Sequence, residues 1–198
     1  YKYREALISY LGRVNYAFKD KYLLSVSLRT DGSSRFAKDY RWSWFPAVSA
    51  GWRVEEEQFM KPVNWISALK LRASYGVTGN NNLPTNTTGS RSLSSYAYSN
   101  TFFPALYSFG TSGKVVPGLA ISSYTLGNKE LTWERTNEYN LGVDFGVLKN
   151  RILLGLEFYY SITDKLLTKE ASMAWIGSNE VWSNKGKVRN RGIEIELS

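Results

Sequence analysis

The acidic side chains are the first candidates for chemistry in this sequence. Glu55, Glu56 and Glu57 follow one another, and such a group could hold a metal ion or supply paired carboxylates. The chain contains no histidine and no cysteine, so it lacks the commonest general base and the usual ligands of transition metals. Calcium binding through oxygen ligands stays open, but no ligand spacing supports it. We therefore expect a solvated charge run, no metal site, no cofactor and no enzymatic activity.

A second candidate is the stretch Asp31-Gly32-Ser33-Ser34-Arg35-Phe36. In a binding site near a pore, Asp31 and Arg35 would contact a ligand. The same residue types are typical of a turn, in which Asp31 caps backbone amides and Arg35 pairs with a neighbouring carboxylate. We favour the turn.

Aromatic side chains gather in the two longest polar segments of the chain. Their flat faces could stack on sugars or contact a partner protein, or they could pack the loops against each other. Both interpretations stay open at this point. The candidate ligand or partner contacts are Tyr96, Tyr98, Phe102, Phe103, Tyr107, Phe109, Trp175 and Trp182.

The elements that position these residues are long strands with a period of two. From Trp133 to Val147, odd positions are apolar from Tyr139 onward, whereas even positions are polar or glycine throughout. This run exceeds the usual length of a globular strand, about 5–6 residues, and about 9–11 tilted residues suffice to cross a bilayer. Aromatic residues near the strand ends, among them Phe18, Tyr22, Trp42, Trp44 and Trp52, would form two interfacial girdles.

Similar alternation predicts about seven antiparallel strands in a single all-β unit. Pro46 lies inside the third strand, where we expect a bulge. Long loops are expected at about 79–130 and 169–187, on the same side as the link after the second strand. The expected strands are 6–18, 22–31, 42–54, 69–78, 131–147, 152–163 and 188–198.

Short turns at one end and long loops at the other indicate a transmembrane β-barrel rather than a soluble sandwich. An odd strand number leaves two edges that need partners, so we expect a segment of a larger barrel. No stretch has the roughly 18 apolar residues that a spanning helix needs. The start Tyr1-Lys2-Tyr3 lacks the features of a signal peptide, which suggests a processed or partial chain.

The net charge of +8 raises the question of nucleic-acid binding. The Lys and Arg residues are scattered singly through strands and turns, and no nucleic-acid motif is present. We expect no nucleic-acid partner; attraction to anionic lipid head groups fits the charge better, and a solvated surface is the plainest interpretation.

Several segments resemble the SusC/RagA-like family of TonB-dependent outer-membrane transporters. The resemblance rests on the combination of DGSSRF, FPAVSAGW and LRASYGVTGN, within matching stretches from Ile8 to Met60, Leu69 to Asn80, Leu131 to Ile152 and Asn184 to Leu197. It implies a roughly 22-stranded barrel whose lumen holds a plug. It further implies a location in the outer membrane of Bacteroidetes, import energised by TonB acting on a plug that this chain does not contain, and a SusD-like lipoprotein that helps to capture glycans or peptides.

On this interpretation the protein is a barrel wall that imports oligosaccharides or peptides, with lipid against its outer face. A soluble carbohydrate-binding β-domain is the alternative, and it would fold alone in buffer. A glycosidase needs two convergent carboxylates, which the spacing of the strand acids neither requires nor excludes. The residues expected to face the lumen or the plug are Arg29, Arg53, Arg72, Glu134, Glu138, Asp144 and Glu157.

Overall fold

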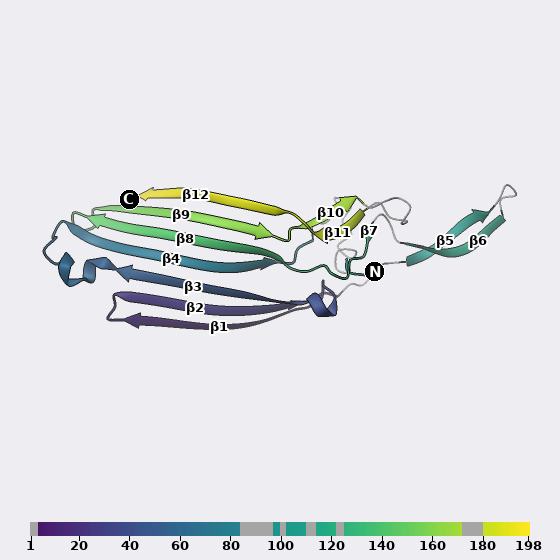
Figure 1. Ribbon diagram of the computed structural model, residues 1–198, viewed down its shortest axis with the longest axis horizontal. Helices are drawn as coiled ribbons and strands as arrows, with labels where there is room; N and C mark the ends of the chain where they lie inside the picture. The colour runs from purple at the N-terminus through teal and green to yellow at the C-terminus, as the bar shows by residue number, and fades with distance from the viewer. Residues whose placement is uncertain (1–3, 84–96, 100–101, 110–113, 122–124, 172–179) are drawn as a thin grey trace.

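The fold is built on one long antiparallel sheet, seen face-on in Figure 1. The computed structural model describes residues 4–83, 97–99, 102–109, 114–121, 125–171 and 180–198. Seven strands pair in the order β1-β2-β3-β4-β8-β9-β12. Their bounds are β1 Leu7–Phe18, β2 Tyr22–Ser33, β3 Trp42–Arg53, β4 Ile66–Asn80, β8 Glu134–Val147, β9 Ile152–Asp164 and β12 Lys187–Leu197.

Across the middle of the sheet each face keeps the same character from strand to strand, because the register aligns the period-two patterns of all seven strands. One row of directly paired residues crosses the whole sheet on what we call the apolar face. The row consists of Tyr16, Leu24, Ala50, Ala73, Leu141, Phe158 and Ile193. A shift of one residue in any pair would turn a strand over, so the pattern fixes the register.

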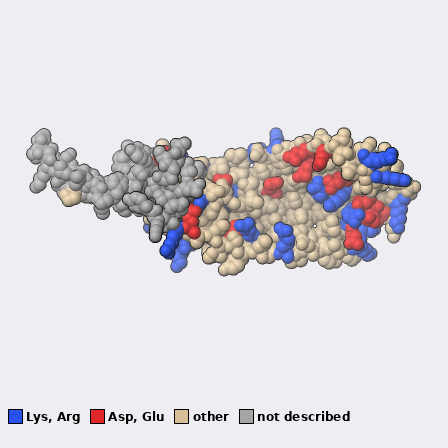
Figure 2. Space-filling model, turned by 180° about the vertical axis from the view of Figure 1, so that it is seen from behind, with Lys and Arg blue, Asp and Glu red and all other residues tan. Residues whose placement is uncertain are grey.

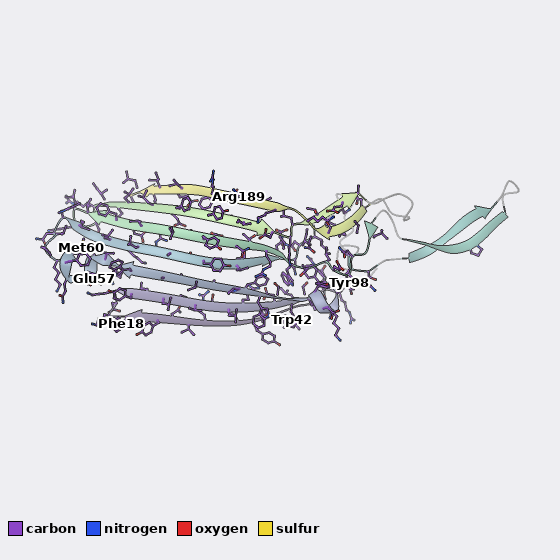
Figure 3. All side chains as sticks on the ribbon, in the orientation of Figure 1. Phe18, Trp42, Glu57, Met60, Tyr98 and Arg189 are labelled. Carbon is purple, nitrogen blue, oxygen red and sulfur yellow. The ribbon has the colours of Figure 1, made fainter. Side chains whose placement is uncertain are left out.

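Aromatic rings mark both ends of the apolar face. Near the short turns, Tyr22 stacks between Phe18 and Trp52, with ring centroids 6.4 and 6.3 Å apart. Toward the long loops, Tyr10 stacks on Trp42 at 6.0 Å. Phe18 and Trp42 therefore lie at opposite ends of the sheet (Figure 3). This is the arrangement expected of two interfacial girdles.

Tight turns close one end of the sheet. Lys19 and Asp20, between β1 and β2, have positive φ, and so do Leu148, Lys149 and Asn150 between β8 and β9. The first link has three residues and the second has four, and residues in the left-handed region are common in short hairpin loops of this kind. The link from β3 to β4 is longer and contains two 3₁₀ turns, η2 (Val54–Glu56) and η3 (Gln58–Met60).

The bulge expected at Pro46 does not occur. The pairing of β2 with β3 runs without a register shift from Tyr22/Trp52 to Gly32/Trp42, and Pro46 lies opposite Leu28. Pairing of β3 with β4 begins only at Ala47, one residue beyond the proline. Pro46 thus lacks a ladder partner on the β4 side, which is where a residue without an N–H is tolerated. The bulge lies instead in β4, between Ile66 and Ala68.

The long loops contain further strands that alternation did not predict. The strands β10 (Leu167–Ala171), β11 (Glu180–Asn184) and β7 (Thr125–Leu126) form a three-stranded sheet. The hairpin of β5 (Phe102–Phe109) and β6 (Lys114–Ile121) extends beyond this end of the molecule (Figure 1). A 3₁₀ turn, η1 (Lys38–Tyr40), lies between β2 and β3.

The buried core lies at this long-loop end and not between two layers. We call it the loop platform, because its residues come from the β2–β3 link, the ends of β3 and β4, the connection between β4 and β8, and β10–β11. Its members are Phe36, Phe45, Val77, Leu83, Ala97, Leu131, Trp133, Leu167 and Trp182. Leu131 and Trp133 were expected within a strand, but β8 begins at Glu134 because these two side chains turn into the platform.

Helices contribute little to the described part of the chain. None of the described helical segments is long and apolar enough to cross a membrane.

Candidate functional site

The face opposite the apolar rows carries most of the polar side chains of the sheet, and we call it the polar face. Its central feature is Arg72 on β4. The Nη2 atom of Arg72 lies 2.9 Å from Oδ1 of Asp144 on β8 and 3.5 Å from Oε2 of Glu157 on β9. The Asn140 amide also donates a hydrogen bond to Glu157. Three strands are thus linked by side chains above their backbone ladder, and each residue remains partly open to solvent.

This network continues into a polar hollow of about 270 Å³ over β8, β9 and β12. Glu138, Glu157 and Glu194 contribute carboxylates to it, and Glu157 pairs directly with Glu194 across the strands. Within the described residues, no group of three or more His, Cys, Asp or Glu side chains could hold a metal ion. The three carboxylates therefore give this hollow an acidic lining.

The other residues expected to face the lumen also lie on the polar face, but Arg29, Arg53 and Glu134 form ion pairs or hydrogen bonds with groups beside them and do not join the Arg72 network. Arg29 Nε lies 2.7 Å from Oδ1 of Asp31, whose side chain is buried. Arg53 contacts Glu55 at 3.0 Å and Glu56 at 3.1 Å. Glu134 accepts hydrogen bonds from Asn80 Nδ2 and from the backbone N–H of Leu167. The seven candidates are therefore spread along the sheet, and only Arg72, Asp144, Glu157 and the adjoining Glu138 come together.

Glu57 departs from the expectation of a solvated charge run. Its carboxylate accepts hydrogen bonds from Tyr22 Oη at 2.7 Å, Lys21 Nζ at 3.1 Å and Trp52 Nε1 at 3.3 Å. Only 16% of the Glu57 side chain is exposed. These donors, that of Tyr22 first, hold the pKa of Glu57 below its usual value. Glu57 thus connects the β1–β2 turn, β3 and the η2–η3 link at the short-turn end (Figure 3).

Glu55 is equally structural. It accepts a hydrogen bond from the backbone N–H of Leu69 at 3.3 Å in addition to its contact with Arg53. The run of three acids alone could not predict these partners, because Leu69 and Tyr22 are distant from it in sequence.

Figure 2 shows acidic and basic side chains interspersed on one face of the molecule, most densely toward the short-turn end.

The turn expected over Asp31–Phe36 is shorter than predicted, because Asp31, Gly32 and Ser33 are the last residues of β2 and only the residues from Ser34 to Phe36 form the turn. Arg35 Nη2 contacts Oε2 of Glu5 at 3.0 Å, and its Nη1 donates to the backbone oxygen of Asn81. Phe36 is fully buried in the loop platform. Asp31 differs from the expectation, because it pairs with Arg29 rather than capping backbone amides.

The aromatic candidates for ligand or partner contact have different surroundings. Trp182 is buried in the loop platform, with Lys169 Nζ 5.3 Å from the centre of its ring, so it packs loops together. Tyr98 is partly exposed near the platform (Figure 3). Tyr96 and Trp175 lie outside the described residues. Phe102, Phe103, Tyr107 and Phe109 belong to β5, of which the backbone alone is described.

The platform also contains a contact that alternation could not reveal. The Trp133 indole Nε1 donates a hydrogen bond to the backbone oxygen of Arg41 at 2.7 Å, and its ring meets those of Phe36 and Phe45. In the sequence, the one indication of this role was that Trp133 is an apolar residue within a polar stretch, directly before a strand. This contact fixes the β2–β3 link against the segment that leads into β8.

Comparisons with known proteins agree with this architecture. The chain is 37% identical to the TonB-dependent receptor SusC of Bacteroides thetaiotaomicron over 199 residues, which is 100% of this chain and 19% of that protein. The structure of the RagAB peptide transporter is similar to this chain, with a TM-score of 0.78 and 29% sequence identity. The match covers 98% of this chain and 20% of the RagAB chain. The siderophore receptor PirA of Pseudomonas aeruginosa shares the fold, with a TM-score of 0.59 and 16% sequence identity. The match covers 98% of this chain and 31% of the PirA chain.

The chain spans less than a fifth of the length of the curated relatives it matches. These results confirm the SusC/RagA-like resemblance and an antiparallel barrel segment in the outer membrane. The family model described as "TonB dependent receptor-like, beta-barrel" matches residues 4–198, so the chain belongs to that family of transport receptors.

Proposed function

We propose that residues 1–198 form part of the barrel wall of an outer-membrane TonB-dependent nutrient importer. The observation that carries this proposal is the single apolar row from Tyr16 to Ile193, with the Arg72 network on the opposite face. A wall with hydrocarbon on one side and water on the other needs this division. The plug, and with it the site on which TonB acts, would lie in parts of the protein outside these residues.

The substrates are oligosaccharides or peptides, captured together with a SusD-like surface lipoprotein. Two similarities support this part of the proposal. SusC is 37% identical to this chain, and one similar solved structure is described as a peptide transporter. The partly exposed Tyr98 and the β5–β6 hairpin, which extend from the long-loop end, are the described parts in a position to meet a substrate or the lipoprotein.

The wall does no covalent chemistry on this proposal. Arg72, Asp144 and Glu157 neutralise one another in part, so they present fixed dipoles and polar contacts rather than a single strong charge. Such a surface allows polar solutes to pass and offers hydrogen bonds to a plug. The seven candidate lumen residues have this role.

Exposure of the apolar face argues against the soluble alternative. Leu141 is 58% exposed, Phe158 44% and Ile193 70%, all in one row. Soluble monomers rarely expose contiguous apolar patches larger than a few hundred Å². A soluble carbohydrate-binding domain would need another layer over this face.

The test uses the full-length transporter in its native membrane. Replacement of Val143 or Leu154 by Arg should each cost about 2–4 kcal/mol if the site is near the membrane midplane, so the amount of assembled, heat-modifiable barrel should fall. Ser161→Arg is the matched control, because Ser161 lies on the polar face of β9 opposite Glu138. Normal assembly of both apolar-face variants would contradict the proposal.

A further inference from the structure

The apolar face of β12 changes character abruptly along the strand. Ile193, Ile195 and Leu197 are 70–72% exposed and continue the apolar rows. Because side chains alternate between the two faces of a strand, the residues that follow on this face toward the long loops are Arg191, Arg189 and Lys187. Three cations therefore follow directly on three aliphatic side chains that face the same way.

The register shows the level at which this change occurs. Tyr75, Tyr139 and Tyr160 are directly paired across β4, β8 and β9, and Arg191 is the next residue in that row. The tyrosine rings lie 4.9 and 6.3 Å apart. Rows of tyrosine mark the boundary between hydrocarbon and head groups in membrane barrels. On β1, β2 and β3 the same register row holds Val14, Val26 and Val48, so only its part from Tyr75 to Arg191 reaches this boundary, as expected when tilted strands carry a row across the membrane at an angle. Arg191 thus lies beside tyrosines of the boundary, and Arg189 lies about 6.5–7 Å farther out along the strand.

Arg189 and Arg191 are exposed, and their guanidinium groups have no ion pair within the described part of the chain. Arg189 projects away from the neighbouring strands (Figure 3). Lys187 differs, because its Nζ lies 3.3 Å from Oδ1 of Asp164. Asp164 is the acid nearest in register, and it is already paired. Two uncompensated guanidinium groups therefore remain at the level where lipid head groups begin.

We propose that Arg189 and Arg191 bind the phosphate of a lipid head group in the outer leaflet. This inference rests on the proposed membrane-spanning function. Guanidinium groups bind phosphate through paired, charge-assisted hydrogen bonds. The acyl chains of the same lipid lie along Ile193, Ile195 and Leu197, whose exposed side chains continue below the two arginines on one face. The ligand class is a lipid with an anionic, phosphorylated head group rather than a free anion or a zwitterionic lipid, because the site combines a doubly cationic end with an aliphatic track.

The experiment measures lipid binding to the full-length transporter, purified in a non-ionic detergent, by native mass spectrometry. Diphosphoryl lipid A is the probe, and phosphatidylcholine and inorganic phosphate are the comparison ligands. The double variant Arg189→Gln/Arg191→Gln should bind lipid A about tenfold more weakly, as expected for lost charge-assisted contacts. Its binding of phosphatidylcholine should not change.

The matched control is Lys61→Gln/Arg151→Gln, which removes the same charge from exposed positions at the short-turn end. It should bind lipid A like the wild type. Equal binding of lipid A by the arginine variant, or equal loss in the control, would overturn the proposal. A response to inorganic phosphate as strong as that to lipid A would also overturn it, since that result indicates a free-anion site.

Failure of this inference can be distinguished from failure of the proposed function. Membrane assembly of the wild type, read from heat-modifiable migration, reports on the barrel alone. If the wild type assembles but the arginine variant binds lipid A normally, the lipid site is wrong and the barrel stands.

Discussion

Arg72 on β4 reaches Glu157 on β9 across the strand that separates them, with Nη2 3.5 Å from Oε2. The pairing partner of both residues on the intervening β8 is Gly142. A Cβ atom at that position would lie 3.0 Å from Cζ of Arg72. The glycine therefore leaves the space through which an arginine can contact an acid two strands away.

Gly142→Val should uncouple Arg72 from Glu157 while the fold persists, since the flexible end of the arginine can move aside. The coupling between Arg72→Gln and Glu157→Gln, measured in a double-mutant cycle by urea unfolding, should be at most about 1 kcal/mol because both side chains are partly exposed. It should fall to near zero in the Gly142→Val background. Gly76→Val is the control, because the nearest contact of its Cβ is an ordinary 3.5 Å. An unchanged coupling would refute this role of Gly142.

Gly79→Ala should be more damaging than a change of one methyl group suggests. The added Cβ would lie 2.1 Å from Cζ of Phe45, whose ring is held in the loop platform. Overpacking of this kind costs about 1–3 kcal/mol. The urea midpoint of the full-length protein should drop, whereas Gly12→Ala should leave it unchanged, because nothing lies within 4 Å of that position. Equal midpoints for the two variants would count against the tight contact.

Trp133→Phe should loosen the β2–β3 link. The change keeps an aromatic ring but removes the donor to the backbone oxygen of Arg41, and a lost buried hydrogen bond costs about 1–3 kcal/mol. Trypsin added to intact cells should then cut more quickly near Lys38 and Arg41. Trp65→Phe, at the opposite end of the sheet, should not change the cleavage rate. No difference between the two variants would mean that the indole does not hold the link.

Glu57 should make stability depend on pH. Because its folded-state pKa is lowered, its stabilising effect is complete above the unfolded pKa and is lost as pH falls through the folded value. The urea midpoint of the wild type should therefore decrease on acidification, and Glu57→Gln should show a flatter profile. Glu56→Gln, at a more exposed site, should retain the wild-type slope. A Glu57→Gln profile as steep as that of the wild type would contradict this assignment.

The fold class could be predicted because alternation is a local property that each strand carries in its own residues. Tyr139 to Val147 show the two faces without reference to any other segment. The partners of β4 were harder to foresee, since β4 pairs with β8 across more than fifty residues of loop. The strands within those loops were not predicted, because their segments lack clear alternation.

The candidate site was only partly accessible to sequence reasoning. Alternation put Arg72, Asp144 and Glu157 on one face, but their contact depends on register and on the glycine between them. The role of Glu57 depends on residues from three strand ends that fold together. For Trp182 the sequence left open whether it contacts a partner or packs the loops, and its burial supports packing, because a loop of this length needs a core of its own.

The divergence of β3 from β4 beyond Ala47 gives the wall a seam at its outer rim. Below that point the two strands are held by directional backbone bonds, which resist separation. Above it, Phe45 fills the gap by ring contacts, which weaken gradually with distance and have no fixed direction. Along this line the outer end of the wall is therefore held by packing of side chains, whereas the part below Ala47 is held by the backbone ladder.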